Sequence, residues 1–594
     1  MTIQTSTTRR SIPRPVLRPL GYTGRVRITD GPFAERIRDA IDTYMALPVD
    51  DVLHGYRSLA GGPAPAGKAM TGWSGKDTEA TFGQWVSGLA RIGVTAGSPE
   101  AIERAVELIR GWWETVPDGG DHRMSGYGIE KVVCGLVDLA EYSGHPEMLD
   151  LVAPIAAASS EVFSRARPAG DAKDFEGGIL SPTRTLEWYT FAENFYRAWL
   201  LGADDSVREF AEEWHYDTFW DRFLERPAAG TPWEVPVWLH AYSHLNTFAS
   251  VAQLYEVTGD ERWLRILRNA HEYFTTTQLY ATGGYGPGEL TLPEDGTLGR
   301  SVEWRTDNAE IVCGSWAAFK LSTALLKHTG EAKYGDWVEQ LVYSGIGAVT
   351  PVETSGRSPY YQDYRLGIAT KLPHWDDWPC CSGTYIQNVA HLPDLVYFAG
   401  DDGIAVNLYL PATVEWEHDG ATRTLTQTTL FPQADTAQLE VGGADGHFAV
   451  RLRVPGWSKG FAVSVNGEAV DVPAVAGTWL VLDREWRAGD RIEVVLGATL
   501  RALPIDRWHP NRVAFAHGPV VLAQTAEWTS PIALHTPVEM VDLDQAFVRE
   551  EGLVYRPVGP GTARLPQGTL KPLSDYPDRF PYRLYFDLDD ARII

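Results

Sequence analysis

Apolar residues recur three and four positions apart in many segments between about residues 30 and 400. This spacing puts apolar side chains on one face of a helix. It predicts helices near 33–46, 82–94, 99–116, 128–144, 145–166, 187–202, 205–223, 237–259, 260–280, 309–330, 331–349 and 383–400. Several of these segments are separated by a glycine that precedes small or acidic residues, at Gly97, Gly144, Gly202, Gly259 and Gly330. Glycine often ends helices and acidic residues often begin them, so this punctuation predicts a repeat of helical hairpins.

Paired hairpins favour a closed (α/α)6 barrel, in which inner and outer helices alternate. An open solenoid of hairpins has the same periodicity and is kept as an alternative. Near residue 403 the pattern changes to strict alternation of apolar and polar positions, and turns such as Asn466-Gly467 follow. Alternation with such turns is typical of short antiparallel strands. We therefore expect a chain that is mainly α with β, its helical part followed by β-sandwich domains.

The change of pattern also predicts where the domains begin and end. The expected parts are an N-terminal segment over 1–29, the barrel as catalytic domain over 30–402, a β-sandwich over 403–500 and a second β-sandwich-like domain over 501–594. We expect the N-terminal segment to pack on the β-domains, with 24–28 as a strand that completes the second one. Because no low-complexity linker separates the parts, they are expected to pack against one another.

Composition and charge narrow the class of partner. The net charge of -26 argues against nucleic acid and against an anionic membrane surface. Most of the 22 Trp are expected in the core, although aromatic faces also stack on sugar rings. No stretch approaches 18 apolar residues, so no membrane span is predicted. No apolar run follows Met1 and four cysteines are no disulfide framework, so we expect a cytoplasmic protein.

Two adjacent cysteines, Cys380 and Cys381, are the most unusual chemical feature of the chain. Adjacent cysteines rarely bridge each other, because such a disulfide is strained. Glu310 and Cys313 are three positions apart, so on a helix they would share a face. Together the four side chains make a plausible tetrahedral zinc set. Alternatively, Glu310 is a solvated residue and the cysteines are core residues, as we expect for Cys134.

Three strings resemble one known family: Glu-x-x-Cys-Gly at 310–314, Cys-Cys-Ser-Gly-Thr at 380–384 and Gly-Gly-Tyr-Gly-Pro-Gly-Glu at 283–289. With Leu-Arg-Val-Pro-Gly-Trp at 452–457 in the β part, the chain resembles the β-L-arabinofuranosidase superfamily, glycoside hydrolase family 127 and its relative family 146. The resemblance covers most of the chain. It implies an (α/α)6 barrel followed by β-sandwich domains, which agrees with the helical pattern.

The resemblance also implies a mechanism. Zinc would be held by Glu310, Cys313, Cys380 and Cys381, with Cys380 as the nucleophile and Glu289 as the acid/base. This suits a retaining glycosidase, which needs a nucleophile and an opposing acid, because coordination to zinc deprotonates a thiol. The family pattern has one residue between the Glu and the Cys, whereas here there are two. Two other ligand sets therefore stay open: the three cysteines with water, or the three cysteines with another carboxylate such as Glu303.

Other residues are candidates for binding the sugar. His240 and His244 lie four apart on one predicted helix face and could hydrogen-bond hydroxyl groups. An ordinary role as satisfied polar groups at the barrel mouth explains them equally well. Aromatic and acidic residues near the predicted helix starts complete the expected substrate-binding set, namely Trp73, Tyr127, Glu187, Tyr361 and Trp378.

These features and the family resemblance together predict a zinc-dependent retaining glycoside hydrolase. The resemblance implies exo action that releases a terminal β-L-arabinofuranose or related sugar, and we expect small glycosides or oligosaccharides as substrates. One alternative is a carbohydrate lyase or isomerase on the same barrel, which would use a Tyr or His base and would not need Cys380. Another is a non-enzymatic sugar-binding protein with a structural zinc ion. A homodimer is compatible with the sequence.

Overall fold

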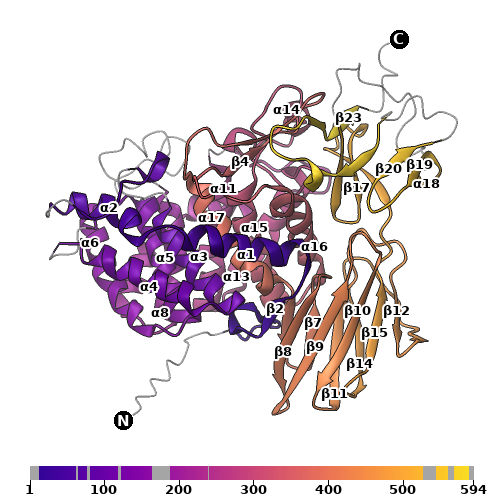
Figure 1. The fold of residues 1–594 in the computed structure, drawn as a ribbon, viewed down its shortest axis with the longest axis horizontal. Coiled ribbons are helices and arrows are strands. Elements are labelled where there is room, and N and C mark those ends of the chain that lie inside the picture. The colour runs from indigo at the N-terminus through magenta and orange to yellow at the C-terminus, as the bar shows by residue number, and fades with distance from the viewer. Residues whose placement is uncertain are drawn as a thin grey trace.

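The structure is a computed structural model of the chain. It describes residues 13–61, 65–75, 81–117, 122–163, 187–237, 240–525, 543–558 and 568–587. A body of helices forms one side of the molecule, and two groups of strands, orange and yellow, form the other (Figure 1). The predicted order, a helix-rich domain followed by a β-rich region, is confirmed.

Six helices form a closed inner ring in which each contacts the next and the last contacts the first. They are α3 (Phe82–Ala96), α5 (Gly126–Tyr142), α8 (Ala192–Leu200), α12 (Phe248–Thr258), α15 (Ile311–Thr329) and α17 (Cys380–His391). Most residues of these helices are buried, as expected for helices covered on nearly all sides. The contact between α17 and α3 closes the barrel, so the open solenoid is excluded.

Outer helices bury one face and cover the ring. They are α1 (Gly31–Met45), α2 (Val49–Leu59), α4 (Pro99–Trp113), α6 (Val152–Val162), α9 (Asp205–Glu213), α13 (Glu261–Thr277) and α16 (Gly335–Gln340). Four shorter helices are α10 (Asp217–Trp220), α11 (Ala241–Asn246), α14 (Thr297–Ser301) and α18 (Leu543–Ala546), of which α18 packs on strands β16 and β19 of the C-terminal sheet. Gly97, Gly259 and Gly330 end helices with φ of 71°, 68° and 69°. The predicted glycine punctuation is thus confirmed where it ends α3, α12 and α15.

Several helix boundaries differ from prediction. The segment 237–259 forms two helices, α11 and α12. The helix predicted over 309–330 begins only at Ile311, because the two residues before it form strand β3 (Ala309–Glu310). The segment 383–400 begins as a helix at Cys380, and its last four residues are instead strand β6 (Tyr397–Gly400).

Two sheets follow the barrel and pack as a sandwich. One has the order β1-β6-β7-β11-β14 and the other β13-β12-β15-β10-β9-β8-β2. Their remaining strands are β1 (Arg18–Pro19), β2 (Val26–Ile28), β7 (Gly403–Val406), β8 (Ala412–His418), β9 (Ala421–Thr429), β10 (Thr436–Gly443), β11 (Gly446–Arg453), β12 (Ala462–Val465), β13 (Glu468–Ala469), β14 (Trp479–Trp486) and β15 (Arg491–Val495). Strand β2 pairs with β8, with Val26 opposite Val414. The N-terminal strand therefore completes this first sandwich, and the expectation that it completes the second was wrong.

A third sheet carries the C-terminal strands. Its order is β16-β17-β18-β21-β20-β19, with β22 on β18 and β23 on β17. The strands are β16 (Leu500–Pro504), β17 (Arg512–His517), β18 (Val520–Thr525), β19 (Phe547–Arg549), β20 (Tyr555–Pro557), β21 (Leu570–Pro572), β22 (Tyr582–Arg583) and β23 (Tyr585–Asp587). One hydrophobic core runs from the barrel into the sandwich, and a second joins the third sheet to the segment around Tyr280 and Ala309. Shared cores fit the expectation of packed domains.

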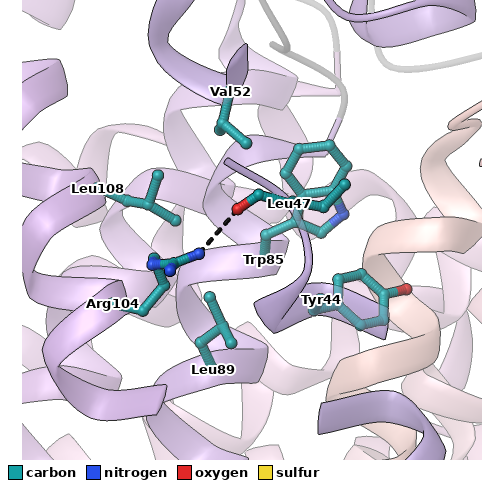
Figure 2. Close-up of a pocket in the computed structure, with 7 residues that line it drawn as sticks. All are labelled: Tyr44, Leu47, Val52, Trp85, Leu89, Arg104 and Leu108. Atoms are coloured by element: carbon teal, nitrogen blue, oxygen red, sulfur yellow. Dashed lines mark hydrogen bonds between the residues drawn. The ribbon is translucent and has the colours of Figure 1, made fainter. Parts of the chain in front are cut away.

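A small pocket between the outer layer and the ring shows how the barrel wall is sealed (Figure 2). Arg104 on α4 points into it and donates a hydrogen bond of 2.7 Å to the carbonyl of Leu47, just beyond the end of α1. The pocket has a volume of about 10 Å³, about what one water molecule needs. It is too small for a sugar.

In the described part of the chain, no helix is both long and apolar enough to cross a membrane.

Candidate active site

The predicted site residues meet at one end of the barrel. Outer helices alternate with inner ones along the chain, so the inner helices run in the same direction and their N-termini share an end. Cys380 is the first residue of α17, and Cys313 lies in the first turn of α15. Helix N-termini carry partial positive charge, which favours thiolate over thiol. The charge at the helix ends thus favours the anionic forms of these cysteines, whereas burial opposes it at Cys313.

Glu310 reaches the cysteines from a strand and not from a helix. It belongs to β3, which pairs with β4 (Pro359–Gln362) so that Glu310 lies opposite Tyr361. Strand β5 (Lys371–Pro373) completes this three-stranded sheet. The prediction that Glu310 and Cys313 share a helix face was wrong, because the helix starts at Ile311. The extra residue of the Glu-x-x-Cys string is accommodated by this strand-to-helix transition.

The four predicted ligand side chains form one buried group. Their ligand atoms all lie within 4.8 Å of one another. Cys313 Sγ is 3.3 Å from Cys381 Sγ and 3.8 Å from Cys380 Sγ. Glu310 Oε1 is 3.6 Å from Cys380 Sγ and 3.4 Å from Cys381 Sγ. Sulfur atoms at about 2.3 Å from a tetrahedral zinc ion would be about 3.8 Å apart, so the spacing fits zinc.

The electrostatics of this group call for a cation. Burial raises the pKa of the Glu310 carboxyl to about 8, with a contribution from Cys380. Burial also raises the pKa of the Cys313 and Cys381 thiols well above the usual value. Hydrogen bonds from these two thiols hold the pKa of Cys380 well below it. Four buried donors could all be anionic only beside a positive charge, and three thiolates with a carboxylate would suit a soft ion such as zinc.

The alternative ligand Glu303 lies elsewhere. Its carboxylate forms a 2.8 Å ion pair with Arg512 on β17 and is half exposed. It is not part of the buried cluster. Cys134 is buried 3.6 Å from Asp138 and is likewise outside the cluster, as its predicted core role requires.

The Cys-Cys-Ser-Gly-Thr string has a structural explanation at each later position. Thr384 Oγ1 forms a 2.8 Å hydrogen bond with Cys313 Sγ and so ties α17 to α15. A Cβ at Gly383 would lie 2.2 Å from the Gln84 side chain, so α17 can approach α3 this closely only with glycine. Tyr44 donates a hydrogen bond to the carbonyl of Ser382. These contacts fix the start of α17 and, with it, the direction of both thiols.

Glu289 lies on the glycine-rich loop that faces the cysteines. It ends the short helix η6 (Pro287–Glu289) and has a φ of 60°. A Cβ at Gly284 would lie 2.8 Å from Ala309, which explains why this loop is rich in glycine. Tyr361 and Tyr360 both donate hydrogen bonds to Glu289 Oε1, the latter at 3.1 Å.

Tyr360 connects the two predicted catalytic groups. Its hydroxyl is 3.1 Å from Glu289 Oε1 and 3.7 Å from Cys380 Sγ. The carboxylate oxygen and the sulfur are therefore at most 6.8 Å apart, the sum of these two distances. Tyr360 was not predicted as a site residue, although it stands beside the predicted Tyr361 in a Tyr-Tyr pair.

His240 and Glu187 form a buried pair beside Glu310 of the Glu/Cys cluster. The Nδ1 atom of His240 bonds to Glu187 Oε1, and its Nε2 atom is 3.6 Å from Glu310 Oε2. Burial opposes the charged imidazole, but the two carboxylates outweigh it and hold the pKa of His240 well above its usual value. His244 does not share this position. It is buried within α11 with its ring 4.6 Å from that of Tyr189, so the predicted common histidine face is absent.

The remaining predicted sugar ligands divide into two groups. Tyr127 is buried near the thiols, and burial together with Cys380 raises the pKa of its hydroxyl. Trp73 is 39% exposed and packs edge-on against Tyr360, so an open aromatic face lies beside the site. Trp378 is only 3% exposed and packs edge-on against Trp85, and its role in substrate binding stays a prediction. Its backbone N–H donates a hydrogen bond to the carbonyl of Gly356, just before the cysteine pair.

Comparisons with known proteins agree with this architecture. The sequence model of the β-L-arabinofuranosidase GH127 catalytic domain matches residues 25–394, and that of the GH127 middle domain matches 403–498. The non-reducing end β-L-arabinofuranosidase of Bifidobacterium longum subsp. longum is 23% identical over 308 residues, 46% of this chain and 43% of that protein. The chain thus matches less than half the length of this curated relative.

Solved structures show the same fold over nearly the whole chain. A GH127 β-arabinofuranosidase superposes with a TM-score of 0.72 at 18% identity, over 97% of this chain and 98% of the other. A GH127 β-L-arabinofuranosidase from Geobacillus stearothermophilus T6 gives 0.69 at 18% identity, over 95% and 100%. The match of the catalytic-domain model to more than half of the chain shows that this protein belongs to glycoside hydrolase family 127, the β-L-arabinofuranosidase family.

Proposed function

We propose that this protein is a retaining exo-glycoside hydrolase with Cys380 as nucleophile and Glu289 as acid/base. The observation that carries the proposal is the limit of 6.8 Å between Cys380 Sγ and Glu289 Oε1. Retaining glycosidases hold their two reacting groups about 5–5.5 Å apart, whereas inverting enzymes need about 6.5–9.5 Å to admit a water molecule. The limit of 6.8 Å admits the retaining separation and excludes most of the inverting range, which supports direct attack on the sugar.

Each residue has a chemical task in this proposal. Glu289 donates a proton to the glycosidic oxygen while Cys380 Sγ attacks the anomeric carbon. Glu289 then removes a proton from water, which releases the sugar from the sulfur with the original anomeric configuration. Tyr360 and Tyr361 hold Glu289 Oε1, which leaves Oε2 for the glycosidic oxygen. Bound zinc, held by Glu310 and the three cysteines, would keep the thiols deprotonated.

We further propose that the substrate is a small glycoside or oligosaccharide ending in β-L-arabinofuranose or a related sugar. The names of the curated and structural relatives support the sugar. Trp73, beside Tyr360 and partly exposed, suits stacking on the leaving group. A cytoplasmic location and a homodimer remain proposals from the sequence.

The test is a panel of p-nitrophenyl furanosides and pyranosides with metal analysis of each protein. Wild type should cleave a β-L-arabinofuranoside or a related furanoside and contain about one zinc ion per chain. Cys380→Ser and Glu289→Gln should each lose at least about 100-fold in kcat, whereas the matched control Cys134→Ser should keep activity. NMR of the first product should show retention of configuration.

Different failures would point to different conclusions. Cleavage that persists in Cys380→Ser would refute the thiolate mechanism and favour the lyase or isomerase alternative. A wild-type protein that holds zinc and binds sugar but turns over none of the glycosides would favour a binding protein. A wild-type protein without metal would refute the zinc assignment.

A further inference from the structure

Two residues behind the metal cluster adopt a backbone conformation that ordinary side chains avoid. Glu187 has φ 55° and ψ 34°, and His240 has φ 59° and ψ 65°. Left-handed conformations cost roughly 1–2 kcal/mol for residues with a Cβ. Neither residue is a glycine or an asparagine, so the surroundings must hold both in place. Strain of this kind often accompanies a functional constraint.

The side chains of these two residues form a chain that ends at Glu310. Glu187 Oε1 bonds to His240 Nδ1, and His240 Nε2 faces Glu310 Oε2 at 3.6 Å. All three residues are at least 95% buried. The two oxygens of Glu310 have different neighbours, because Oε1 faces the sulfurs of Cys380 and Cys381.

We propose that Glu187 is a positioning residue: it orients His240 so that the imidazole holds Glu310 Oε2 and thereby directs Oε1 towards the metal-binding sulfurs. The inference rests on the proposed metal site but not on the identity of the sugar. Outer partners of this kind commonly fix the orientation of a metal ligand. This positioning role differs from the sequence-based prediction that Glu187 and His240 bind the substrate.

The geometry favours positioning over substrate binding. An imidazole has two ring nitrogens, and here Nδ1 bonds to one carboxylate while Nε2 faces another. A sugar hydroxyl would have to displace Glu310 from Nε2. The bond to Glu187 also fixes the ring plane, since His240 lies just before α11 and not within it.

The test measures the metal site without substrate. Glu187→Gln removes the charge and keeps the volume, and Glu187→Asp keeps the charge. The matched control is Glu256→Gln, because Glu256 is also a buried carboxylate that contacts a histidine, His328 at 3.3 Å, yet it is outside the cluster. Each protein is loaded with Co²⁺ for its thiolate absorption and then with zinc for release to a chelator.

We expect Glu187→Gln to release zinc about 10–100-fold faster than wild type and to alter the Co²⁺ spectrum. Glu187→Asp should recover part of both properties, and Glu256→Gln should match wild type. In steady state, kcat should fall in Glu187→Gln with KM changed less. A raised KM with unchanged zinc release and spectrum would overturn the proposal and make Glu187 a substrate-binding residue.

Folding and function are separated within the same experiment. If Glu187→Gln does not fold, the comparison of Glu187→Asp with wild type decides, since a shorter carboxylate must still perturb the Co²⁺ spectrum. If wild type hydrolyses no glycoside but the variants release zinc faster, the positioning role stands and the proposed hydrolase fails. If zinc release is unchanged in both variants, the positioning role fails.

Discussion

His271 on α13 should make the protein sensitive to mild acid. Its side chain is 8% exposed and packs edge-on against Tyr334 and Trp337 at 4.8 and 5.6 Å. Burial, with the nearby charge of Lys333, lowers its pKa to about 3. The perturbation is His271→Phe, which retains an aromatic ring among aromatic neighbours and removes the titrating group.

The magnitude follows from the two pKa values. At pH 7.5 the imidazole is neutral in the folded and the unfolded chain, so its titration does not affect stability. At pH 5.0 the unfolded residue, with a pKa of about 6.5, is protonated, whereas the folded one is not. Protonation therefore stabilises the unfolded state relative to the folded state by about 2 kcal/mol at pH 5.0. This follows from about 1.4 kcal/mol for each pH unit below 6.5. His271 therefore does not lower the free energy of unfolding above pH 6.5. It lowers this free energy progressively as the pH falls from 6.5 towards the folded-state pKa of about 3.

The assay is urea unfolding, followed by tryptophan fluorescence, of wild type and His271→Phe at both pH values. The decisive quantity is the loss of unfolding free energy between pH 7.5 and 5.0, because any constant packing cost of phenylalanine cancels. The variant should lose about 2 kcal/mol less than wild type. Equal losses in the two proteins would refute the assignment of a buried neutral histidine.

Three further predictions concern the site. Trp73→Ala should raise KM up to about tenfold for a disaccharide but leave a methyl glycoside unchanged, which steady-state kinetics can test. Gly286→Ala places a Cβ 2.8 Å from that of Ala241 and should displace Glu289, so kcat/KM falls on the order of 100-fold while zinc content is unchanged. Chelation should lower the midpoint of thermal unfolding and zinc should restore it; an unchanged midpoint would contradict a metal site coupled to folding.

The helical part of the fold was predictable because its signals are local. Outer helices such as α4 bury one stripe of side chains, including Ala101, Ala105 and Trp112, and a glycine in the left-handed conformation ends α3 just before it. Periodicity and capping can be recognised within one segment. The spacing of Glu310, Cys313 and the paired cysteines likewise predicted residues that do lie together.

Features that depend on distant partners were missed or misplaced. Among the described strands β4 pairs with β3 and β5, and Val26 lies opposite Val414, nearly 400 positions away. Neither pairing has a local signature. The burial of Trp378 also has no local signature, because Gly356 and Trp85, from other parts of the chain, pack against its ring.

The backbone strain of the site could not be predicted from the sequence. It shows that stability and function place opposite demands on the same positions. Eight residues other than glycine have positive φ in the described part of the chain, and Glu187, His240, Glu289 and Trp378 are four of them. At roughly 1–2 kcal/mol each, their combined cost is comparable to the net stability of a domain. Glycine at these positions would relieve the strain but would remove the side chain that holds or carries the chemistry. At these four positions stability and function are therefore opposed, and the closed barrel supplies the packing that maintains them.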